Sequence, residues 1–153
     1  RRSKMKTYIG TKVIEAKPMN RGDYNKYRGR EIPTDENPTD NGYLVKYPDG
    51  YESWSPAEVF EEAYRAFDDG MNFGHAIELM KKGLKVARKG WNGKGMYLFL
   101  AQGENLTTCL SEGDFKCASS VCMKTAQNNI CVGWLASQAD MLADDWMVVD
   151  SNR

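Results

Sequence analysis

The sequence predicts an α+β protein made of two consecutive parts. In the first part, the turn sequence Pro48-Asp49-Gly50 lies between two strand-like runs and indicates a β-hairpin. Two helices with start signals follow it, and beyond them apolar runs of strand length alternate with turns. We therefore expect a small antiparallel β-sheet domain with a leading helix in the C-terminal half. A smaller α+β segment with a hairpin and a capped helix precedes it.

The first part begins with an apolar-containing run, residues 8–16, which predicts a strand. Residues 20–42 are rich in Asn, Asp and Gly, so we expect mostly loop with one helical turn around residues 24–28. The two strands of the hairpin are expected at residues 42–47 and 51–54. Proline presets φ in the turn between them, and Asp-Gly tolerates the positive φ that closes it.

The helix after the hairpin has the clearest start signal in the chain. Ser55 can cap it, Pro56 suits the first helical position, and Glu58 completes a capping box. We expect the helix to end before Gly70. Its apolar face is formed by Val59, Phe60, Ala63, Tyr64 and Phe67.

A second helix is expected to start after the capping residue Asn72 and to stop at Gly83. Its apolar stripe consists of Phe73, Ala76, Ile77 and Met80. Because the polar sequence Asp68-Asp69-Gly70 separates the two helices, we expect a boundary there. Residues 1–70 would form an N-terminal extension of unknown role, and residues 71–153 a second domain.

The remaining sequence predicts a sheet with one more short helix. Residues 102–120 are polar and are expected to form an irregular insertion. Ser137 and Asp140 can cap a short helix that continues through Leu142. The expected strands are residues 85–91, 96–101, 121–125, 130–135 and 146–149.

Composition argues against several classes of function. The 153 residues include 21 basic and 21 acidic side chains, so no overall positive charge attracts nucleic acid. The longest apolar run, residues 96–101, is too short to span a membrane. No apolar segment follows the basic N-terminal residues, so we expect no secretory signal and a start at Met5.

Histidine and cysteine chemistry is limited as well. The chain has one histidine, His75, which we expect to be a surface or boundary residue because it lacks catalytic partners. The cysteines at positions 109, 117, 122 and 131 form no C-x-x-C pair. We therefore expect reduced structural thiols and no metal site.

A candidate anion site surrounds the glycine-rich sequence from Trp91 to Gly95. Exposed backbone N–H groups bind anions when cations lie close by, and Arg88, Lys89 and Lys94 flank this loop. Trp91 adds an aromatic face suited to stacking on a base. Packing at the end of a strand explains Trp91 equally well.

The other three tryptophans have structural interpretations. Trp54 precedes a helix and Trp134 lies in an expected strand, so we assign both side chains to the core. Trp146 and Trp134 flank the short helix that starts after Ser137, whose N-terminus could receive an anion. Core packing is the alternative for Trp146.

Four segments of the second part carry a family resemblance. They are residues 71–76 (MNFGHA), 86–96 (VARKGWNGKGM), 133–138 (GWLASQ) and 140–146 (DMLADDW). These segments resemble the second family of Thoeris anti-defence proteins, which are small phage proteins. The first 70 residues lie outside this resemblance and are similar to segments of other phage and prophage proteins of no known activity.

The resemblance implies a protein that is not an enzyme and has no catalytic residue, cofactor or metal. Such proteins bind the cyclic ADP-ribose isomer made by bacterial TIR enzymes and withhold it from its effector, in the cytoplasm of the infected host. They assemble as homotetramers, with nucleotide pockets between subunits. Some members are thought also to hold cyclic dinucleotides at separate pockets.

By position, Trp91 and Trp146 match the aromatic residues expected to sandwich the ligand. Five neighbours are added as candidate ligand contacts because they are adjacent or cationic: Asn92, Lys94, Asp145, Arg88 and Lys89. Nucleic acid and membranes are not expected as partners.

Two other classes of function stay open. In the first, the protein is a toxin or structural interaction module of a prophage, and its tryptophans are simply core. In the second, it is a hydrolase that degrades the nucleotide with Asp144 or Asp145 as the base. Adjacent residues that lead into a strand point to opposite sides, which makes this pair a weak candidate.

Overall fold

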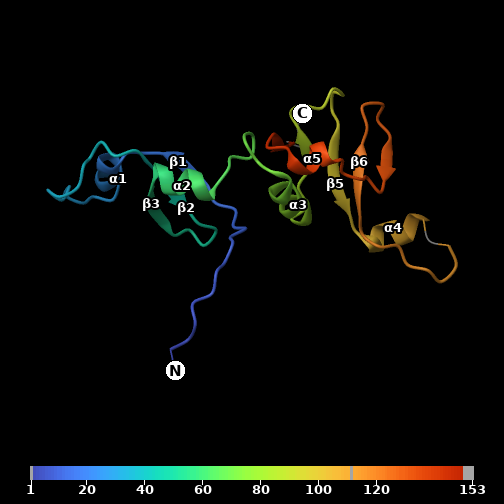
Figure 1. Ribbon diagram of the computed structural model, residues 1–153, viewed down its shortest axis with the longest axis horizontal. Helices are drawn as coiled ribbons and strands as arrows, with labels where there is room; N and C mark the ends of the chain where they lie inside the picture. Colours follow the sequence, from blue (N-terminus) through green and yellow to red (C-terminus); the bar gives the residue numbers. More distant parts are fainter. Residues whose placement is uncertain (1, 111, 150–153) are drawn as a thin grey trace. The chain divides into compact units, whose positions relative to one another are not determined.

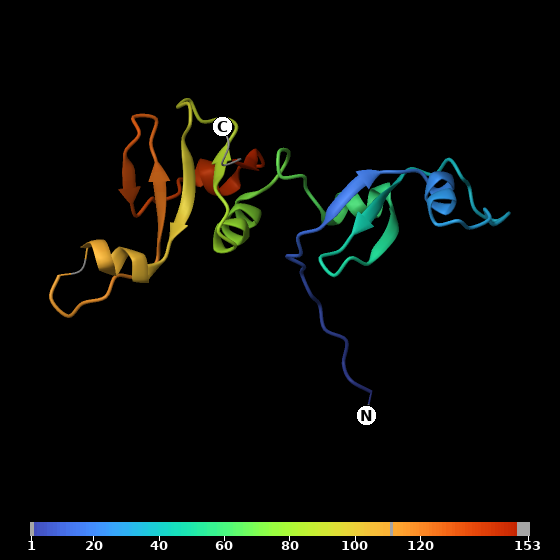
Figure 2. The same cartoon turned by 180° about the vertical axis from the view of Figure 1, so that it is seen from behind.

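The computed structural model describes residues 2–110 and 112–149 (Figure 1). The chain divides into two compact units, Arg1–Tyr64 and Arg65–Arg153. We call them unit 1 and unit 2, and Figure 2 shows the elements of each from behind. Helices and antiparallel sheets occur in both units, which confirms the α+β class. Within the described residues, no helix has the length and hydropathy needed to cross a membrane.

Unit 1 contains a three-stranded antiparallel sheet with the order β1-β2-β3. The predicted hairpin is confirmed, because Gly50 adopts a φ of 87° and its amide donates to the Tyr47 carbonyl at 2.9 Å. The bounds are β1 (Glu15–Pro18), β2 (Gly42–Lys46) and β3 (Glu52–Pro56). Of the strand expected at residues 8–16, only the last two residues lie in β1. In the part of the chain that the structure describes, the preceding stretch has no partner strand, and Tyr8 and Ile9 are exposed.

Two short helices complete unit 1. Helix α1 (Arg21–Tyr27) contains the expected turn and begins at Asn20, whose Oδ1 accepts from the Asp23 amide at 2.8 Å. Helix α2 (Ala57–Ala63) packs on β2 and β3. Its Phe60 ring stacks on Tyr43 with the ring centroids 4.0 Å apart.

The predicted start and end of α2 were wrong. The β2–β3 ladder continues through the pairs Tyr43–Ser55 and Gly42–Pro56, so Ser55 lies in a strand and cannot cap the helix. Pro56 occupies the N-cap position and has no side-chain hydrogen bond there. The helix ends at Ala63 rather than near Gly70, because Tyr64 is extended.

Unit 2 is a five-stranded antiparallel sheet with the order β7-β6-β5-β4-β8. The last strand pairs with β4 and not with β7, which precedes it in the sequence. Helix α3 packs on β4, β5 and β8. The bounds are α3 (Phe73–Lys81), β4 (Val86–Arg88), β5 (Tyr97–Ala101), α4 (Gly103–Leu110), β6 (Ser120–Lys124), β7 (Ile130–Val132), α5 (Gln138–Leu142) and β8 (Trp146–Val148).

Helix α3 starts and ends as predicted. The Asn72 side chain accepts from the His75 amide at 2.9 Å, and the Asn72 amide donates to His75 Nδ1 at 3.1 Å. Gly83, with a φ of 88°, follows the helix. His75 therefore serves as a capping side chain.

Helix α4 was not predicted, because the polar sequence 102–120 was expected to be irregular. Side-chain hydrogen bonds hold this helix in place. The Thr107 hydroxyl donates to the Gly103 carbonyl at 2.7 Å and accepts from the Cys117 amide at 2.8 Å. Ser119 Oγ accepts from the Gly103 amide at 3.0 Å. The bonds to Ser119 and Cys117 connect the helix to the segment that leads into β6. The pattern of apolar residues does not reveal such polar bonds, so it could not predict this helix.

Candidate functional site

Four aromatic side chains form a cluster in unit 2, which we call the tryptophan cluster: Phe73, Trp91, Trp134 and Trp146. The Trp91 and Trp146 rings meet edge to face with their centroids 5.5 Å apart. Trp134 lies 6.1 Å from Trp91 and 6.4 Å from Trp146. Phe73, at the start of α3, is 5.4 Å from Trp146. Such tilted and edge contacts are the favoured geometry for aromatic pairs.

Trp146 is the buried centre of this cluster. Its relative exposure is 0%, and its Nε1 donates to the Asp140 carbonyl at 2.9 Å. Because the Trp146 ring contacts Phe73 at the start of α3, it lies on the face of the sheet that α3 covers. In this arrangement no base fits between Trp91 and Trp146, because the two rings contact each other directly.

Trp91 lies on the open side of the cluster, in the loop between β4 and β5. It is half-buried, and its Nε1 lies 3.5 Å from Asp140 Oδ1. The deeper rings fix its orientation, and part of its surface remains accessible. Trp91 is thus the half-buried tryptophan of this cluster that opens the polar, glycine-rich loop between β4 and β5.

Arg88 forms ion pairs with two carboxylates. Its Nε donates to Asp145 Oδ1 and its Nη1 to Asp140 Oδ1, both at 2.9 Å. The hydrogen bonds to Asp145 and then Asp140 raise the pKa of the Arg88 guanidinium despite some burial. The Arg88 side chain is 20% exposed. Its charge is therefore already balanced by two carboxylates within the chain.

Asp145 also holds the backbone of the loop. Its Oδ2 accepts from the Gly90 amide at 2.9 Å, and its carbonyl accepts from the Lys89 amide at 3.0 Å. Burial raises the pKa of Asp145, but hydrogen bonds from Arg88 and the Gly90 amide outweigh that effect and leave the pKa below its usual value. A Cβ at position 90 would lie 2.9 Å from Asp145 Oδ2, so glycine fits this close approach.

Asp140 connects α5 to Arg88 and Trp91. It was not among the predicted ligand contacts. Its Oδ1 faces Arg88 and Trp91, and its Oδ2 accepts from the Ser137 amide at 3.1 Å and from the Ser137 hydroxyl at 2.8 Å. Burial raises the pKa of Asp140, but the hydrogen bonds from Arg88 and Ser137 outweigh that effect and leave the pKa below its usual value, so the carboxylate is ionised at neutral pH. The Ser-x-x-Asp pattern predicted its capping role. Its bonds to β4 depend on tertiary structure.

This site lies within a known family domain. Residues 71–149 match the sequence profile of the Thoeris anti-defense 2-like domain. The chain belongs to the Thoeris anti-defense 2-like family. It is 40% identical over 85 residues to Thoeris anti-defense 2 of Bacillus phage SP01, an alignment that covers 52% of this chain and 94% of that protein. The tryptophan cluster and its carboxylates lie inside the Thoeris anti-defense 2-like domain, whereas the first 70 residues lie outside it.

Three polar residues expected at the site, Lys89, Asn92 and Lys94, are exposed in the Thoeris anti-defense 2-like domain. Asn92 and Lys94 are exposed in the loop after Trp91. Lys89 is also exposed, and its Nζ lies 3.5 Å from Asp69 Oδ1. Gly95, with a φ of 71°, turns the loop toward β5, and its carbonyl accepts from Lys124 Nζ at 3.0 Å. Lys124, the last residue of β6, is a further cation at this loop, and the sequence did not suggest it.

Asp144 and Asp145 of the Thoeris anti-defense 2-like domain are not arranged as an acid–base pair. Asp144 is exposed, and Asp145 is bound to Arg88 and to the Gly90 amide. A carboxylate whose pKa is lowered in this way is a weak base. Across residues 2–110 and 112–149, no group of three or more His, Cys, Asp or Glu side chains is placed to hold a metal. The four cysteines are free thiols, and Cys122 is buried.

Proposed function

We propose that this protein suppresses Thoeris defence by binding the cyclic ADP-ribose isomer that TIR enzymes produce and withholding it, uncleaved, from its effector. One observation carries the proposal, namely the 40% identity to the phage SP01 protein over 94% of its length. That alignment covers about half of this chain, and the family match lies within unit 2, at residues 71–149. The protein would act in the cytoplasm of the infected bacterial host, where the signal is made.

In this proposal, the ligand base stacks on the accessible surface of Trp91. The buried Trp146 supports Trp91 from below and does not form a second wall of a sandwich. Asn92, Lys94 and Lys89 are exposed close to Trp91 in the sequence, and their side chains and backbone N–H groups would contact the ribose and phosphates. Arg88 and Asp145 would hold the loop in place.

Sequestration needs tight binding, and one stacked aromatic ring does not supply it. A nanomolar Kd corresponds to about −12 kcal/mol, whereas stacking contributes about 1–3 kcal/mol per base. Charge-assisted contacts to phosphate and enclosure of the ligand must provide the remainder.

A homotetramer with pockets between subunits would supply this enclosure. Apolar side chains next to the tryptophan cluster in the sequence support such an assembly, since Leu135 is 90% exposed and Leu142 is 78% exposed. A second subunit that covers them would remove apolar surface from water and could add the second wall over Trp91.

The proposal is tested by isothermal titration of the full chain with cyclic ADP-ribose isomers and a panel of cyclic dinucleotides. The complex is then heated, and the released ligand is identified by chromatography. We expect submicromolar binding of a cyclic ADP-ribose isomer and recovery of the intact ligand. Tight binding of a cyclic dinucleotide that does not compete with it would establish separate pockets.

The same experiment separates the other classes of function. Recovery of a cleaved nucleotide would favour a hydrolase that uses Asp144 or Asp145. An absence of binding to every nucleotide in the panel would favour a toxin or structural interaction module of a prophage. The ionised, hydrogen-bonded state of Asp145 supports binding without cleavage.

A further inference from the structure

The chain contains two Asn-Gly sequences, Asn41-Gly42 in unit 1 and Asn92-Gly93 in unit 2. Asparagine deamidates most readily before glycine, because glycine has no side chain to hinder attack by its backbone nitrogen on the asparagine amide. The surrounding structure then controls the rate, since the attacking nitrogen must be able to move toward the side chain. The two sequences differ in this respect and provide a comparison within one chain.

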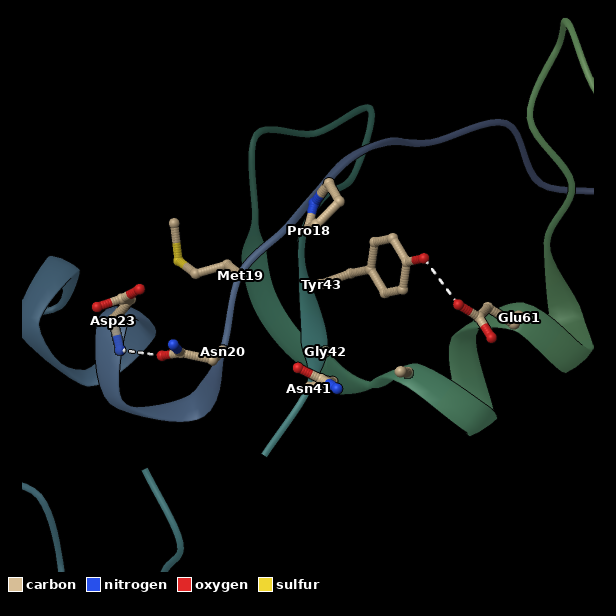
Figure 3. A pocket seen from close by; sticks show the side chains of 9 residues that line it. Pro18, Met19, Asn20, Asp23, Asn41, Gly42, Tyr43 and Glu61 are labelled. Carbon is tan, nitrogen blue, oxygen red and sulfur yellow. Dashed lines mark hydrogen bonds between the residues drawn. The ribbon is translucent and has the colours of Figure 1, made fainter. Parts of the chain in front are cut away.

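The Asn41-Gly42 peptide is held by the sheet of unit 1. Figure 3 shows both residues where β2 begins, close to the start of α2. The Asn41 carbonyl accepts from the Ala57 amide at 3.0 Å, and the Gly42 carbonyl accepts from the Met19 amide at 2.9 Å. A Cβ at position 42 would collide with the Trp54 ring, so the backbone also packs against an aromatic side chain. Deamidation of Asn41 therefore requires the sheet to open first.

The Asn92-Gly93 peptide lies in the loop between β4 and β5, outside any helix or strand. Asn92 is exposed, and within residues 2–110 and 112–149 neither its side chain nor the Gly93 amide has a hydrogen-bond partner. A Cβ at position 93 would collide with Met96 and lie 3.0 Å from the Ala126 Cβ, so packing favours glycine there. The loop thus combines a glycine that packing favours with an exposed asparagine side chain.

Cations at the same loop favour the reaction. The Gly93 nitrogen attacks after it has lost its proton, and positive charge stabilises the anion that forms. Lys94 follows Gly93 directly and is exposed, and Lys124 Nζ donates to the Gly95 carbonyl at 3.0 Å. The two carboxylates that contact the start of the loop are each paired with Arg88, so their charge is offset.

We propose that Asn92 deamidates spontaneously and that the product weakens nucleotide binding; the second part rests on the proposed function, in which Asn92 contacts the ligand. Water or hydroxide takes the proton of the Gly93 nitrogen, which then attacks the side-chain carbonyl carbon of Asn92. The bond from this carbon to the side-chain nitrogen breaks, and ammonia leaves with a proton from water. Water opens the resulting succinimide ring at either carbonyl and gives aspartate or isoaspartate.

Both products replace a neutral amide by a carboxylate in the loop that would face the phosphates of the ligand. The new negative charge repels these phosphates, and isoaspartate also adds a methylene group to the loop backbone. We expect the modified chain to bind the nucleotide about fivefold more weakly.

The first test follows both sites in one sample of the full chain, incubated in warm, mildly alkaline buffer and then digested with trypsin. Cleavage after lysine and arginine places Asn92 in the peptide 90–94 and Asn41 in the peptide 31–46. Chromatography with mass spectrometry separates the amide, aspartate and isoaspartate forms. We expect Asn92 to react at least about tenfold faster than Asn41 in the folded chain, and the two rates to converge in guanidinium chloride. Equal rates in the folded chain would overturn the proposal.

The second test uses two variants to connect the modification to binding. Asn92→Gln keeps a neutral amide but forms a ring far more slowly, so its affinity should be the same before and after incubation. Asn92→Asp should bind weakly from the start, as the incubated original chain does. Calorimetry with a cyclic ADP-ribose isomer compares the three proteins, and circular dichroism checks that each is folded.

The outcomes separate this inference from the proposed function. An equal loss of affinity in incubated Asn92→Gln, or no loss in the deamidated original chain, would overturn the effect on binding. If none of the proteins binds a cyclic nucleotide, the proposed function fails and the effect on binding fails with it. The rates of the two peptides still decide, without any ligand, whether Asn92 is the reactive site.

Discussion

Arg88 and Asp145 join the end of β4 to the residue before β8, with Arg88 Nε and Asp145 Oδ1 2.9 Å apart. The same carboxylate accepts from the Gly90 amide, so one side chain fixes both strand pairing and the start of the Trp91 loop. Stability of unit 2 and presentation of Trp91 are therefore coupled through a single carboxylate.

Asp145→Asn should lower the free energy of unfolding by about 1–3 kcal/mol, because it removes hydrogen bonds between charged groups and leaves Arg88 with one carboxylate partner. Urea denaturation measures this change. The neighbouring, exposed Asp144→Asn is the matched control and should change the stability by less than about 0.5 kcal/mol. Equal losses in the two variants would contradict the structural role of Asp145.

Acid should destabilise the chain through Asp140 and Asp145. The pKa of each is lower in the folded protein, so their contribution is fully present above the unfolded value of about 3.9 and is lost as pH falls through the folded pKa. We expect little change from these groups between about pH 7 and 5 and a loss below about pH 4. The variant with Asp140→Asn and Asp145→Asn should show a shallower acid dependence. Urea melts at several pH values compare the two proteins, and parallel curves would refute the assignment.

Trp91→Ala should weaken nucleotide binding by a factor of about 5 to 150, equivalent to about 1–3 kcal/mol of stacking, while the fold survives. Trp146→Ala removes a fully buried ring and should cost about 3–5 kcal/mol of stability. Titration calorimetry and urea denaturation of the two variants distinguish a binding role from a packing role. If Trp91→Ala binds as the original chain does, the ligand does not stack on Trp91.

Asp140→Asn should weaken nucleotide binding several-fold, because Trp91 and Arg88 lose the charged oxygen that orients them. Ser137→Ala is the control, since it removes the helix cap, at a cost of about 1 kcal/mol, but keeps Asp140 Oδ1 in place. We expect calorimetry to find near-normal affinity for Ser137→Ala. Equal losses of affinity would mean that the α5 cap, and not the Asp140 charge, supports the site.

Local patterns predicted those elements whose determinants are local. The hairpin turn at Asp49-Gly50 and the cap at Asn72 depend on neighbours within a few residues, and both were correct. The Ser55 cap failed because pairing of Ser55 with Tyr43 across the sheet extends the strand through the position where the helix would begin. Helix α4 was missed because its stabilising bonds come from residues in the returning chain.

In the candidate site, too, features with local determinants could be predicted and features that depend on distant residues could not. The glycine-rich loop and Trp91 could be recognised in the sequence, because aromatic and cationic residues adjoin glycines there. That Arg88 is balanced by Asp140 and Asp145, more than fifty residues away, could not be read from the sequence. Complete burial of Trp146 likewise follows from pairing of β8 with β4, a strand order that periodicity does not determine.

Three of the four tryptophans stand within 6.4 Å of one another in unit 2, and Trp54 lies alone in unit 1. Indoles this close exchange excitation, so their near-ultraviolet circular dichroism and emission depend on their mutual angles. The protein thus has an intrinsic spectroscopic signal that arises from its candidate site. With Trp54→Phe, a change in the remaining signal would report directly on how the cluster is arranged, without any attached label.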